Sequence, residues 1–289
     1  MLNVTFYGVR GSTPCPSPAN ARYGGNTACV VLERPDASRT GSSPIILDIG
    51  TGIRSYGDTI PPGVDFSATA LVTHLHWDHV QGLPFFTPVL RDGGRLEVYG
   101  PPPERRVSLA DAFAGFMRPP YFPVTVSELR GEIYFHDFPE GTRTIGDAVV
   151  TAAVVPHTGV THGYRIEWGG VSVAYVSDHQ QPAVGSSDVD PAVLDLCRGV
   201  DLLIHDSQYT PEEFETKLDW GHCTVEYAVH VARQAGAKRL ALFHHDPVHD
   251  DDWLDCLLAE ARLMAPVDLE VISAYEGLTI ALSEESLRP

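Results

Sequence analysis

The sequence predicts an α/β protein, a four-layer αββα sandwich in which two mixed β-sheets pack face to face and helices cover the outer faces. Many short β-branched and apolar runs are separated by Gly, Pro and Ser, and in the later part of the chain such runs alternate with helical patterns. A further observation is that histidine and aspartate recur where the runs end. We therefore expect these side chains to meet in a functional site along one edge of the sheets.

Length and composition favour one domain without a membrane segment. The chain has 289 residues, 43% of them hydrophobic, and no linker, charge block, low-complexity run or repeat divides it, so we expect a single domain over residues 1–289. Residues 2–7 alternate like a strand rather than a signal sequence, and no apolar run approaches membrane-spanning length. Five scattered cysteines, an odd number without close pairs, favour a reducing cytosol. We expect a cytoplasmic protein with no membrane partner.

The acidic balance limits the class of substrate. A formal net charge of −18 repels polyanions and disfavours broad nucleic-acid binding, without excluding it. A small anionic substrate remains compatible with this charge, because two divalent ions would reverse the potential at the site.

The first part of the chain predicts strands with hairpin-like spacing at residues 2–7, 28–33 and 44–49. Residues 8–26, between the first two, form a long Gly-, Pro- and Ser-rich loop that either carries function or is a surface connection. Asp48 closes the third strand, where it could orient a metal-bound imidazole or cap the helix that follows.

The segment HLHWDH at residues 74–79 is the strongest functional signal. It follows an apolar run, residues 68–72, that predicts a buried strand. Alternate side chains of an extended segment share a face, so His74 and His76 can bind one ion. Asp78 and His79 then project from the following turn toward a second ion. Imidazole and carboxylate favour zinc, with manganese or iron as alternatives, and the absence of thiolate disfavours a structural zinc site.

The middle of the chain is less regular. We expect a short helix over residues 81–90 and a strand over 96–99. The stretch 101–144 contains one predicted helix, 104–117, followed by a proline-rich aromatic segment, 118–123, which should run extended. We expect this insertion to be a lid beside the metal site or a contact in a homodimer, with aromatic packing onto the core as the alternative.

The next apolar run, residues 149–155, ends at His157. A histidine at the end of a buried strand repeats the arrangement at His74, so His157 is the expected third ligand of the first ion. His162 lies nearby and competes for this role.

Residues 163–168 and 171–176 predict a hairpin joined by two glycines. Asp178 follows its second strand, where one carboxylate could bridge two ions about 3.5 Å apart. A helix-capping role for Asp178 is the alternative.

Two further strands end in candidate residues. Residues 201–204 lead to His205 and Asp206, and residues 240–243 lead to His244. His244 is the expected last ligand of the second ion, and His245 is its nearest rival.

Helix signals and two more strands complete the pattern. Thr224 has the character of a helix N-cap, and His222 lies just before that helix, where an anion is favoured. Asp250, Asp251 and Asp252 are expected to cap the last helix. Residues 267–272 and 277–282 are expected to close the chain as paired strands.

Together these motifs resemble the metallo-β-lactamase superfamily, and within it the ribonuclease Z-like phosphodiesterase branch. The likeness rests on HLHWDH, Pro156-His157, Ser177-Asp178, Gly221-His222-Cys223-Thr224 and His244, in that order. It implies the metallo-β-lactamase fold and a binuclear metal centre. The implied ligands are His74, His76 and His157 for one ion, Asp78, His79 and His244 for the other, and Asp178 as the bridge. The resemblance also implies that His222 faces phosphate, assisted by Asp206.

The sequence departs from the pattern of that branch in three places. Cys223 stands where Ser is usual, and His179 follows the bridging aspartate where Thr is common. The stretch between Asp206 and His222 is too short for the long arm with which transfer-RNA-processing members grip their substrate.

These expectations define a binuclear metal-dependent hydrolase, most directly a phosphodiesterase for a cyclic nucleotide or a cyclic sugar phosphate. Asp78 would hold the proton of the attacking water, and His222 with Asp206 would donate a proton to the leaving oxygen. The alternatives are a ribonuclease Z-like RNA 3′-processing endonuclease and a carbonyl-centre hydrolase of thioesters or lactams. The sequence leaves open whether four other histidines contact substrate or metal, namely His162, His179, His205 and His245.

Overall fold

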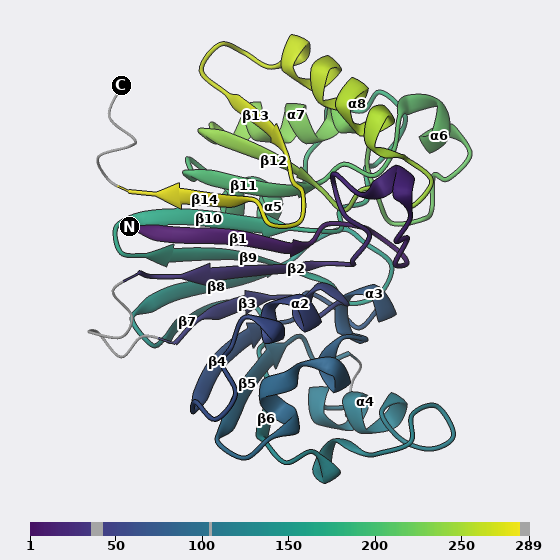
Figure 1. Ribbon diagram of the computed structural model, residues 1–289. Coiled ribbons are helices and arrows are strands. Elements are labelled where there is room, and N and C mark those ends of the chain that lie inside the picture. Colours follow the sequence, from purple (N-terminus) through teal and green to yellow (C-terminus); the bar gives the residue numbers. More distant parts are fainter. Residues whose placement is uncertain (36–42, 104–105, 284–289) are drawn as a thin grey trace.

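The computed structural model describes residues 1–35, 43–103 and 106–283 and contains two β-sheets that face each other (Figure 1). The first sheet has the strand order β14-β1-β2-β3-β4-β5-β6, and the second has the order β13-β12-β11-β10-β9-β8-β7. The strands of the first sheet are β1 Leu2–Gly8, β2 Cys29–Glu33, β3 Ile45–Leu47, β4 Phe66–Leu71, β5 Gly94–Gly100, β6 Glu132–Asp137 and β14 Thr279–Leu282. Those of the second are β7 Gly141–Ile145, β8 Ala148–Val154, β9 His162–Trp168, β10 Val171–Val176, β11 Leu202–Asp206, β12 Arg239–Phe243 and β13 Glu270–Ser273.

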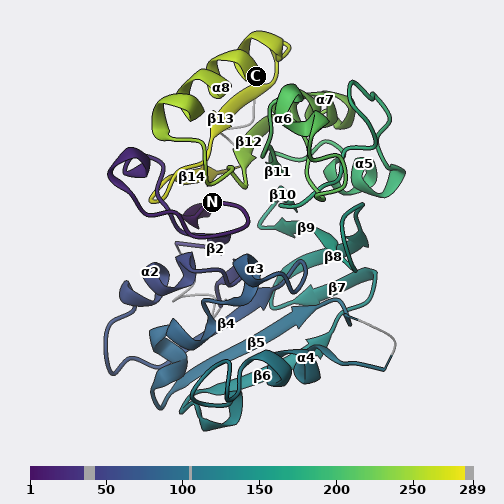
Figure 2. The same ribbon diagram turned by 90° about the vertical axis from the view of Figure 1, so that its right-hand side faces the viewer.

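Helices cover the outer face of each sheet, which completes the four layers (Figures 1 and 2). The helices beside the first sheet are α2 Gly52–Asp58, α3 Trp77–Val80 and α4 Leu109–Phe116. Those beside the second are α5 Pro191–Cys197, α6 Pro211–Glu215, α7 Val225–Ala235 and α8 Asp251–Met264. One buried apolar cluster lies between the sheets, and two others lie beneath the helices. The predicted αββα sandwich of mixed sheets is therefore confirmed. No helix in the described part of the chain is long and apolar enough to cross a membrane.

The second half of the fold places several strand ends at one edge. Strands β10, β11 and β12 are parallel neighbours, with Val176 opposite His205 and Asp206 opposite Phe243. The first sheet is parallel from β3 to β6, and β4 ends at Leu71. Because parallel strands end at the same edge, the loops after β4, β10, β11 and β12 can meet there.

Two predicted elements were wrong. Residues 81–90 are not one helix but two 3₁₀ turns, Leu83–Phe85 and Thr87–Leu90, each with proline near its start, because proline lacks the N–H that an α-helix interior needs. The last two strands do not pair with each other. Strand β13 runs parallel to β12, whereas β14 crosses to the first sheet and pairs with β1.

The stretch 101–144 contains more sheet than the sequence predicted. Its helix is shorter than expected: α4 begins after Ser108, which forms a capping box with Asp111, and residues 104–105 lie outside the described residues. Strands β6 and β7 were not predicted, and each forms one of the two edge strands of its sheet. The proposed role of this stretch as a lid or dimer contact remains a prediction.

Packing between the sheets should dominate stability. The Phe6 side chain is fully buried, with its ring centroid 6.1 Å from that of Phe243 across the interface. Replacing Phe6 by Ala should lower the free energy of unfolding by about 3–5 kcal/mol, measured by urea denaturation. Val267→Ala, at a fully exposed position, should change it by less than about 0.5 kcal/mol. Equal effects of the two changes would contradict this account of the core.

Candidate metal centre

The HLHWDH segment changes conformation within its six residues. The backbone at His76 is extended, with φ −64° and ψ 149°, and His76 is the residue before α3. His74 and His76 therefore precede the helix, whereas Asp78 and His79 lie in its first turn. This change of direction lets one segment supply side chains to two neighbouring points.

The first cluster contains His74, His76 and His157, whose candidate ligand atoms all lie within 4.8 Å of one another. The Nε2 atom of His157 is 3.3 Å from Nδ1 of His76. The other ring nitrogen of His157, Nδ1, donates to the carbonyl oxygen of Gly221 at 2.7 Å, which leaves Nε2 as the atom facing the cluster. His162 belongs to no such cluster in the described residues; it starts β9, and its backbone N–H donates to Thr73.

The second cluster contains Asp78, His79 and His244. The Oδ2 atom of Asp78 lies 3.2 Å from His79 Nε2 and 3.1 Å from His244 Nε2. His245, the rival of His244, is turned away and donates from Nε2 to the carbonyl oxygen of Ala274 at 2.9 Å.

Asp178 lies between the two clusters. Its Oδ1 is 3.2 Å from His79 Nε2, and its Oδ2 is 3.8 Å from His74 Nε2, 3.7 Å from His157 Nε2 and 3.5 Å from His244 Nε2. One carboxylate thus reaches both groups of histidines, which is the arrangement that a bridging ligand requires.

Three ligand candidates are oriented by neighbouring polar groups. The Nδ1 atoms of His79 and His244 are each 2.8 Å from an oxygen, Oδ2 of Asp48 and Oε1 of Gln208 respectively. His74 Nδ1 is 3.0 Å from the Thr73 hydroxyl. These contacts direct each Nε2 atom toward the centre of the site. Asp48 therefore contacts an imidazole, and no side chain caps the start of α2.

The donor atoms fit divalent metal ions. In their neutral forms, with Nδ1 donating to an oxygen, His79 and His244 present Nε2 lone pairs that lie 3.2 Å apart. His74 Nε2 and Asp178 Oδ1 are buried without a hydrogen-bond partner. Lone pairs that face one another repel, and burying them without a partner costs free energy, so a cation between them is stabilising. The imidazole and carboxylate set indicates divalent metal binding and suits zinc.

Electrostatics keep most of these groups in their metal-binding forms. Burial lowers the pKa of His74 well below its usual value, so its ring is neutral. Burial alone would raise the pKa of Asp178, but the surrounding imidazoles, His244 first, hold it well below its usual range. His79 is the exception: burial lowers its pKa, yet the carboxylates of Asp178, Asp78 and Asp48 together raise it well above the usual value. Positive charge is therefore favoured at the point where three carboxylates surround this ring.

Comparisons with known proteins agree with the geometry. The family described as the beta-lactamase superfamily domain matches residues 56–245, about two thirds of the chain. The chain belongs to the metallo-β-lactamase superfamily. Ribonuclease Z of Myxococcus xanthus (strain DK1622) is 28% identical over 284 residues, covering 85% of this chain and 91% of that protein. The sequence thus falls in the ribonuclease Z-like branch, as its motifs predicted.

Two solved structures with this fold resemble the chain along nearly its whole length. The metallo-β-lactamase fold protein YhfI from Bacillus subtilis has a TM-score of 0.71 at 19% identity, covering 96% of this chain and 98% of that one. Human tRNase Z, short form, has a TM-score of 0.68 at 22% identity, covering 97% and 99%. These likenesses concern the fold.

His222 and Asp206 form a pair beside the second cluster of this metallo-β-lactamase site. His222 Nδ1 is 3.0 Å from Asp206 Oδ2, and the His222 ring centroid is 4.9 Å from that of His244. Asp206 also accepts from the backbone N–H groups of His179 and Gln208, each at 3.0 Å. Burial raises the pKa of Asp206 and lowers that of His222. The Asp206 carboxyl group thus contacts two backbone N–H groups and the His222 ring, and it fixes the orientation of that ring through Nδ1.

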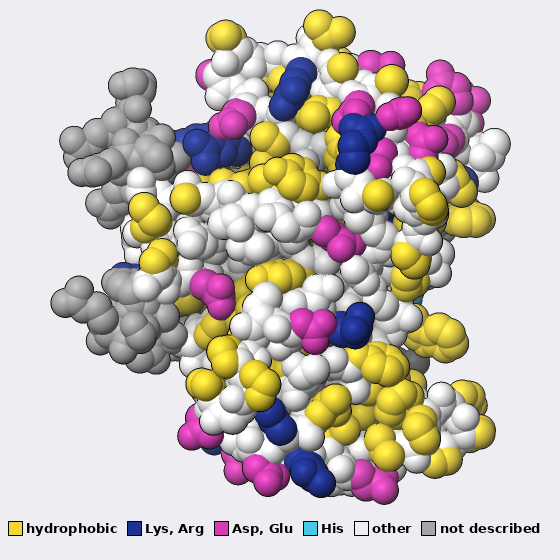
Figure 3. All heavy atoms as spheres, in the orientation of Figure 1, with side chains coloured by type: hydrophobic (Ala, Val, Ile, Leu, Met, Phe, Trp, Pro, Cys, Tyr) yellow, Lys and Arg dark blue, Asp and Glu magenta, His cyan; other side chains and the backbone are white. Residues whose placement is uncertain are grey.

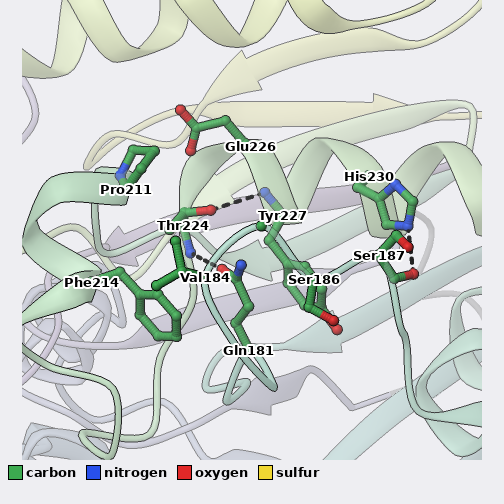
Figure 4. Close-up of a pocket in the computed structure, with 11 residues that line it drawn as sticks. Gln181, Val184, Ser186, Ser187, Pro211, Phe214, Thr224, Glu226, Tyr227 and His230 are labelled. Atoms are coloured by element: carbon green, nitrogen blue, oxygen red, sulfur yellow. Dashed lines mark hydrogen bonds between the residues drawn. The ribbon is translucent and has the colours of Figure 1, made fainter.

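The turn that carries His222 is fixed by Gln181. The Gln181 backbone N–H donates to the carbonyl oxygen of His222, and its side-chain Oε1 accepts from the N–H of Thr224 at 3.1 Å. Figure 4 shows this contact at the start of α7, where the Thr224 side chain caps the helix as predicted by accepting from the N–H of Tyr227. His222 therefore projects from a turn whose backbone is held by two hydrogen bonds to Gln181.

Several predicted residues lie outside the two clusters. The rings of His179 and His205 contact each other, with His179 Nδ1 3.0 Å from His205 Nε2, and neither joins a described ligand cluster. Asp250 caps α8 by accepting from the N–H of Trp253, which confirms the capping prediction for that residue.

Three residues that contact the candidate ligands were not predicted from the sequence, namely Thr73, Gln208 and Ser12. The Ser12 N–H donates to Asp78 Oδ2 at 2.7 Å from the long loop at residues 8–26, and a Cβ at Gly11 would collide with the ring of His244. In the sequence, this contact is indicated only by the position of Gly11 and Ser12 in the loop at residues 8–26, which was expected either to carry function or to be a surface connection.

The choice of His157 over His162 is directly testable. His157→Ala should remove most of the bound metal, because it takes one nitrogen from the first cluster, whereas His162→Ala should retain it. Metal per chain is measured by inductively coupled plasma mass spectrometry after desalting. Metal loss in His162→Ala with retention in His157→Ala would reverse the assignment.

Asp48 should control metal affinity without touching the metal. Asp48→Asn keeps the size of the side chain but weakens its hold on His79, so the dissociation constant for zinc should rise about 10–100-fold, measured by chelator competition. Asp58→Asn, on the exposed end of α2, is the control. An unchanged constant in Asp48→Asn would show that the contact does not tune the site.

Proposed function

We propose that this protein is a metal-dependent hydrolase that cleaves a small phosphodiester, such as a cyclic nucleotide or a cyclic sugar phosphate. The observation that carries the proposal is the His222–Asp206 pair, which lies beside the metal clusters with one ring nitrogen still available. The similarity to ribonuclease Z, whose name denotes a phosphodiester substrate, supports the same class of reaction.

The proposed centre holds two divalent ions, preferably zinc, with manganese or iron as alternatives. The proposed ligands are His74, His76 and His157 for one ion, Asp78, His79 and His244 for the other, and Asp178 as the bridge. When bound, such ions supply Lewis acidity and lower the pKa of water toward about 7. This is the chemistry that attack on phosphorus requires near neutral pH.

Within this site, Asp78 is the proposed proton holder for the attacking water. Burial would raise its pKa, but His79 and His244 hold it well below the usual range, so the carboxylate is ionised and able to accept a hydrogen bond. The N–H of Ser12 donates to the same Oδ2 atom and fixes its direction.

His222 is the proposed proton donor to the leaving oxygen. Asp206 engages Nδ1, so Nε2 is the ring atom that can meet the substrate, and a proton at Nε2 would pass to the oxygen as the P–O bond breaks. A charge-stabilising role toward the phosphate oxygens is compatible with the same geometry.

RNA 3′ processing is the second candidate, favoured by the names of the sequence relatives. Between Asp206 and His222 this chain has only the five-residue helix α6 and short turns. Together with the net charge of −18, this favours a small substrate over transfer RNA. Cleavage at a carbonyl centre is the other alternative within this superfamily.

A substrate panel tests the reaction class. The zinc-loaded protein is assayed on a 2′,3′-cyclic nucleotide, a cyclic ribose phosphate, a transfer-RNA precursor and the lactam nitrocefin. We expect the highest kcat/KM on one of the two small cyclic phosphodiesters. A higher value on nitrocefin would overturn the proposal, and a higher value on the RNA would favour the second candidate.

His222→Ala tests the proposed proton donor. The change should lower kcat on an alkyl phosphodiester about 10²–10⁴-fold while leaving metal content unchanged. The loss should be much smaller on bis-p-nitrophenyl phosphate, whose leaving group needs no proton. His230→Ala, on the following helix, is the control. Metal loss in proportion to activity would instead identify His222 as a ligand.

A further inference from the structure

An aromatic pocket includes Trp77, the residue between the candidate ligands His76 and Asp78. Its volume is about 550 Å³, and it is lined by residues from α3, the 3₁₀ turn after it, the end of α4 and the proline-rich segment. Its aromatic and amide side chains include Trp77, Gln81, Phe85, Phe116, Tyr121 and Phe122. Figure 3 shows a broad hydrophobic area over this corner of the molecule. Nothing in the proposed catalytic machinery accounts for it.

The pocket and the metal centre share one segment of chain. Trp77 stands between His76 and Asp78, and consecutive Cα atoms are about 3.8 Å apart, so the pocket begins one residue from the metal-binding groups. His76 is itself exposed, which places its side of the centre at the molecular surface. If a substrate enters from this exposed side, the group next to its phosphate lies toward the pocket.

The rings in this pocket are unusually exposed. Trp77 and Tyr121 are each 74% exposed and Phe85 is 52% exposed, although they come from three separate segments. The Phe85 ring meets that of Phe122 edge-on, with centroids 5.9 Å apart. Exposed aromatic rings gathered around one hollow mark a binding site more often than isolated exposed rings do.

One polar group complements these rings. Gln81 lines the pocket, half-buried, and its side-chain amide makes no hydrogen bond with any residue of the described ranges. An amide offers both donors and an acceptor, the combination that reads the edge of a base. An acyl chain or a purely apolar partner offers this amide no hydrogen bond, whereas a flat heterocycle can stack on the rings and also bond to Gln81.

We propose that this pocket binds a nucleobase attached to the ribose of the scissile phosphodiester. The proposal deepens the proposed function and rests on it, because it makes the substrate a nucleotide rather than a simple sugar phosphate. Trp77, Phe85 and Tyr121 supply stacking surfaces, and Gln81 contacts the base edge. A cyclic nucleotide and the end of an RNA chain present the same base to this pocket.

Paired substrates separate base binding from catalysis. Tyr121→Ala and Phe85→Ala are assayed on 2′,3′-cyclic AMP and on a cyclic ribose phosphate that lacks a base. The ratio of KM for the nucleotide to KM for the base-free substrate should rise about 10-fold in each variant, since a stacking surface is lost. Tyr275→Ala, another exposed tyrosine that lies outside this pocket, should leave the ratio unchanged. Gln81→Leu should change the preference among the four bases.

A transfer-RNA precursor distinguishes the two sources of the base. If the two ring variants also raise KM about 10-fold on that RNA, the pocket receives a base of RNA. If the rise is confined to the cyclic nucleotide, the pocket serves the small substrate. Equal KM changes on base-bearing and base-free substrates would overturn the proposal. Loss of a dimer in sedimentation, with such equal changes, would assign the aromatic face to a second copy of the chain instead.

A binding measurement separates failure of this inference from failure of the proposed function. Binding of adenosine 3′-monophosphate and of ribose 5-phosphate is compared by equilibrium dialysis, which needs no turnover. Tighter binding of the nucleotide, weakened about 10-fold by Tyr121→Ala, supports the pocket even if no phosphodiester is cleaved. Equal binding of the two ligands would overturn it even if phosphodiesters are cleaved.

Discussion

The site depends on the contact between the loops that leave the two sheets at a common edge. The first sheet supplies the HLHWDH segment after β4, and the second supplies Asp178 and His244 after β10 and β12. His79 and His244 meet across this junction with their Nε2 atoms 3.2 Å apart. No local stretch of chain can create this arrangement, because its parts come from segments far apart in the sequence that the packed core between the sheets brings together.

Asp48 links that packing to the chemistry. Its backbone has φ 57°, an uncommon value for a non-glycine residue, and its side chain is fully buried. The carboxylate accepts from Tyr175 in the second sheet at 2.8 Å and is 2.8 Å from His79 Nδ1 beside the first. It also accepts from the N–H of Thr73 at 2.8 Å. One buried side chain therefore connects both sheets and a candidate ligand, and its hydrogen bonds offset the cost of its burial and of its positive φ.

Much of this arrangement was predictable because candidate residues follow apolar runs, and strand ends are where loops converge. The residues that the sequence singled out as ligands lie together in the two clusters, and His157 and His244 lie there rather than His162 and His245. Their role as metal ligands stays a prediction. It could not find Gln208, because a single amide in a loop has no periodic signal and its partner is distant in the chain. Strand β7 was missed because its side chains are mostly exposed and lack an apolar alternation. The pairing of the last two strands failed because nothing local shows that the chain crosses between sheets before β14.

The central claim is that side chains from both sheets enclose two cations. The most direct measurement is an anomalous difference map at the zinc absorption edge, from crystals of the zinc-loaded protein. The account predicts two peaks about 3.5–4 Å apart, one beside His76 and the other beside His244, with Asp178 between them. A map with no peak at this junction, or with zinc bound only by residues outside the two clusters, would contradict it.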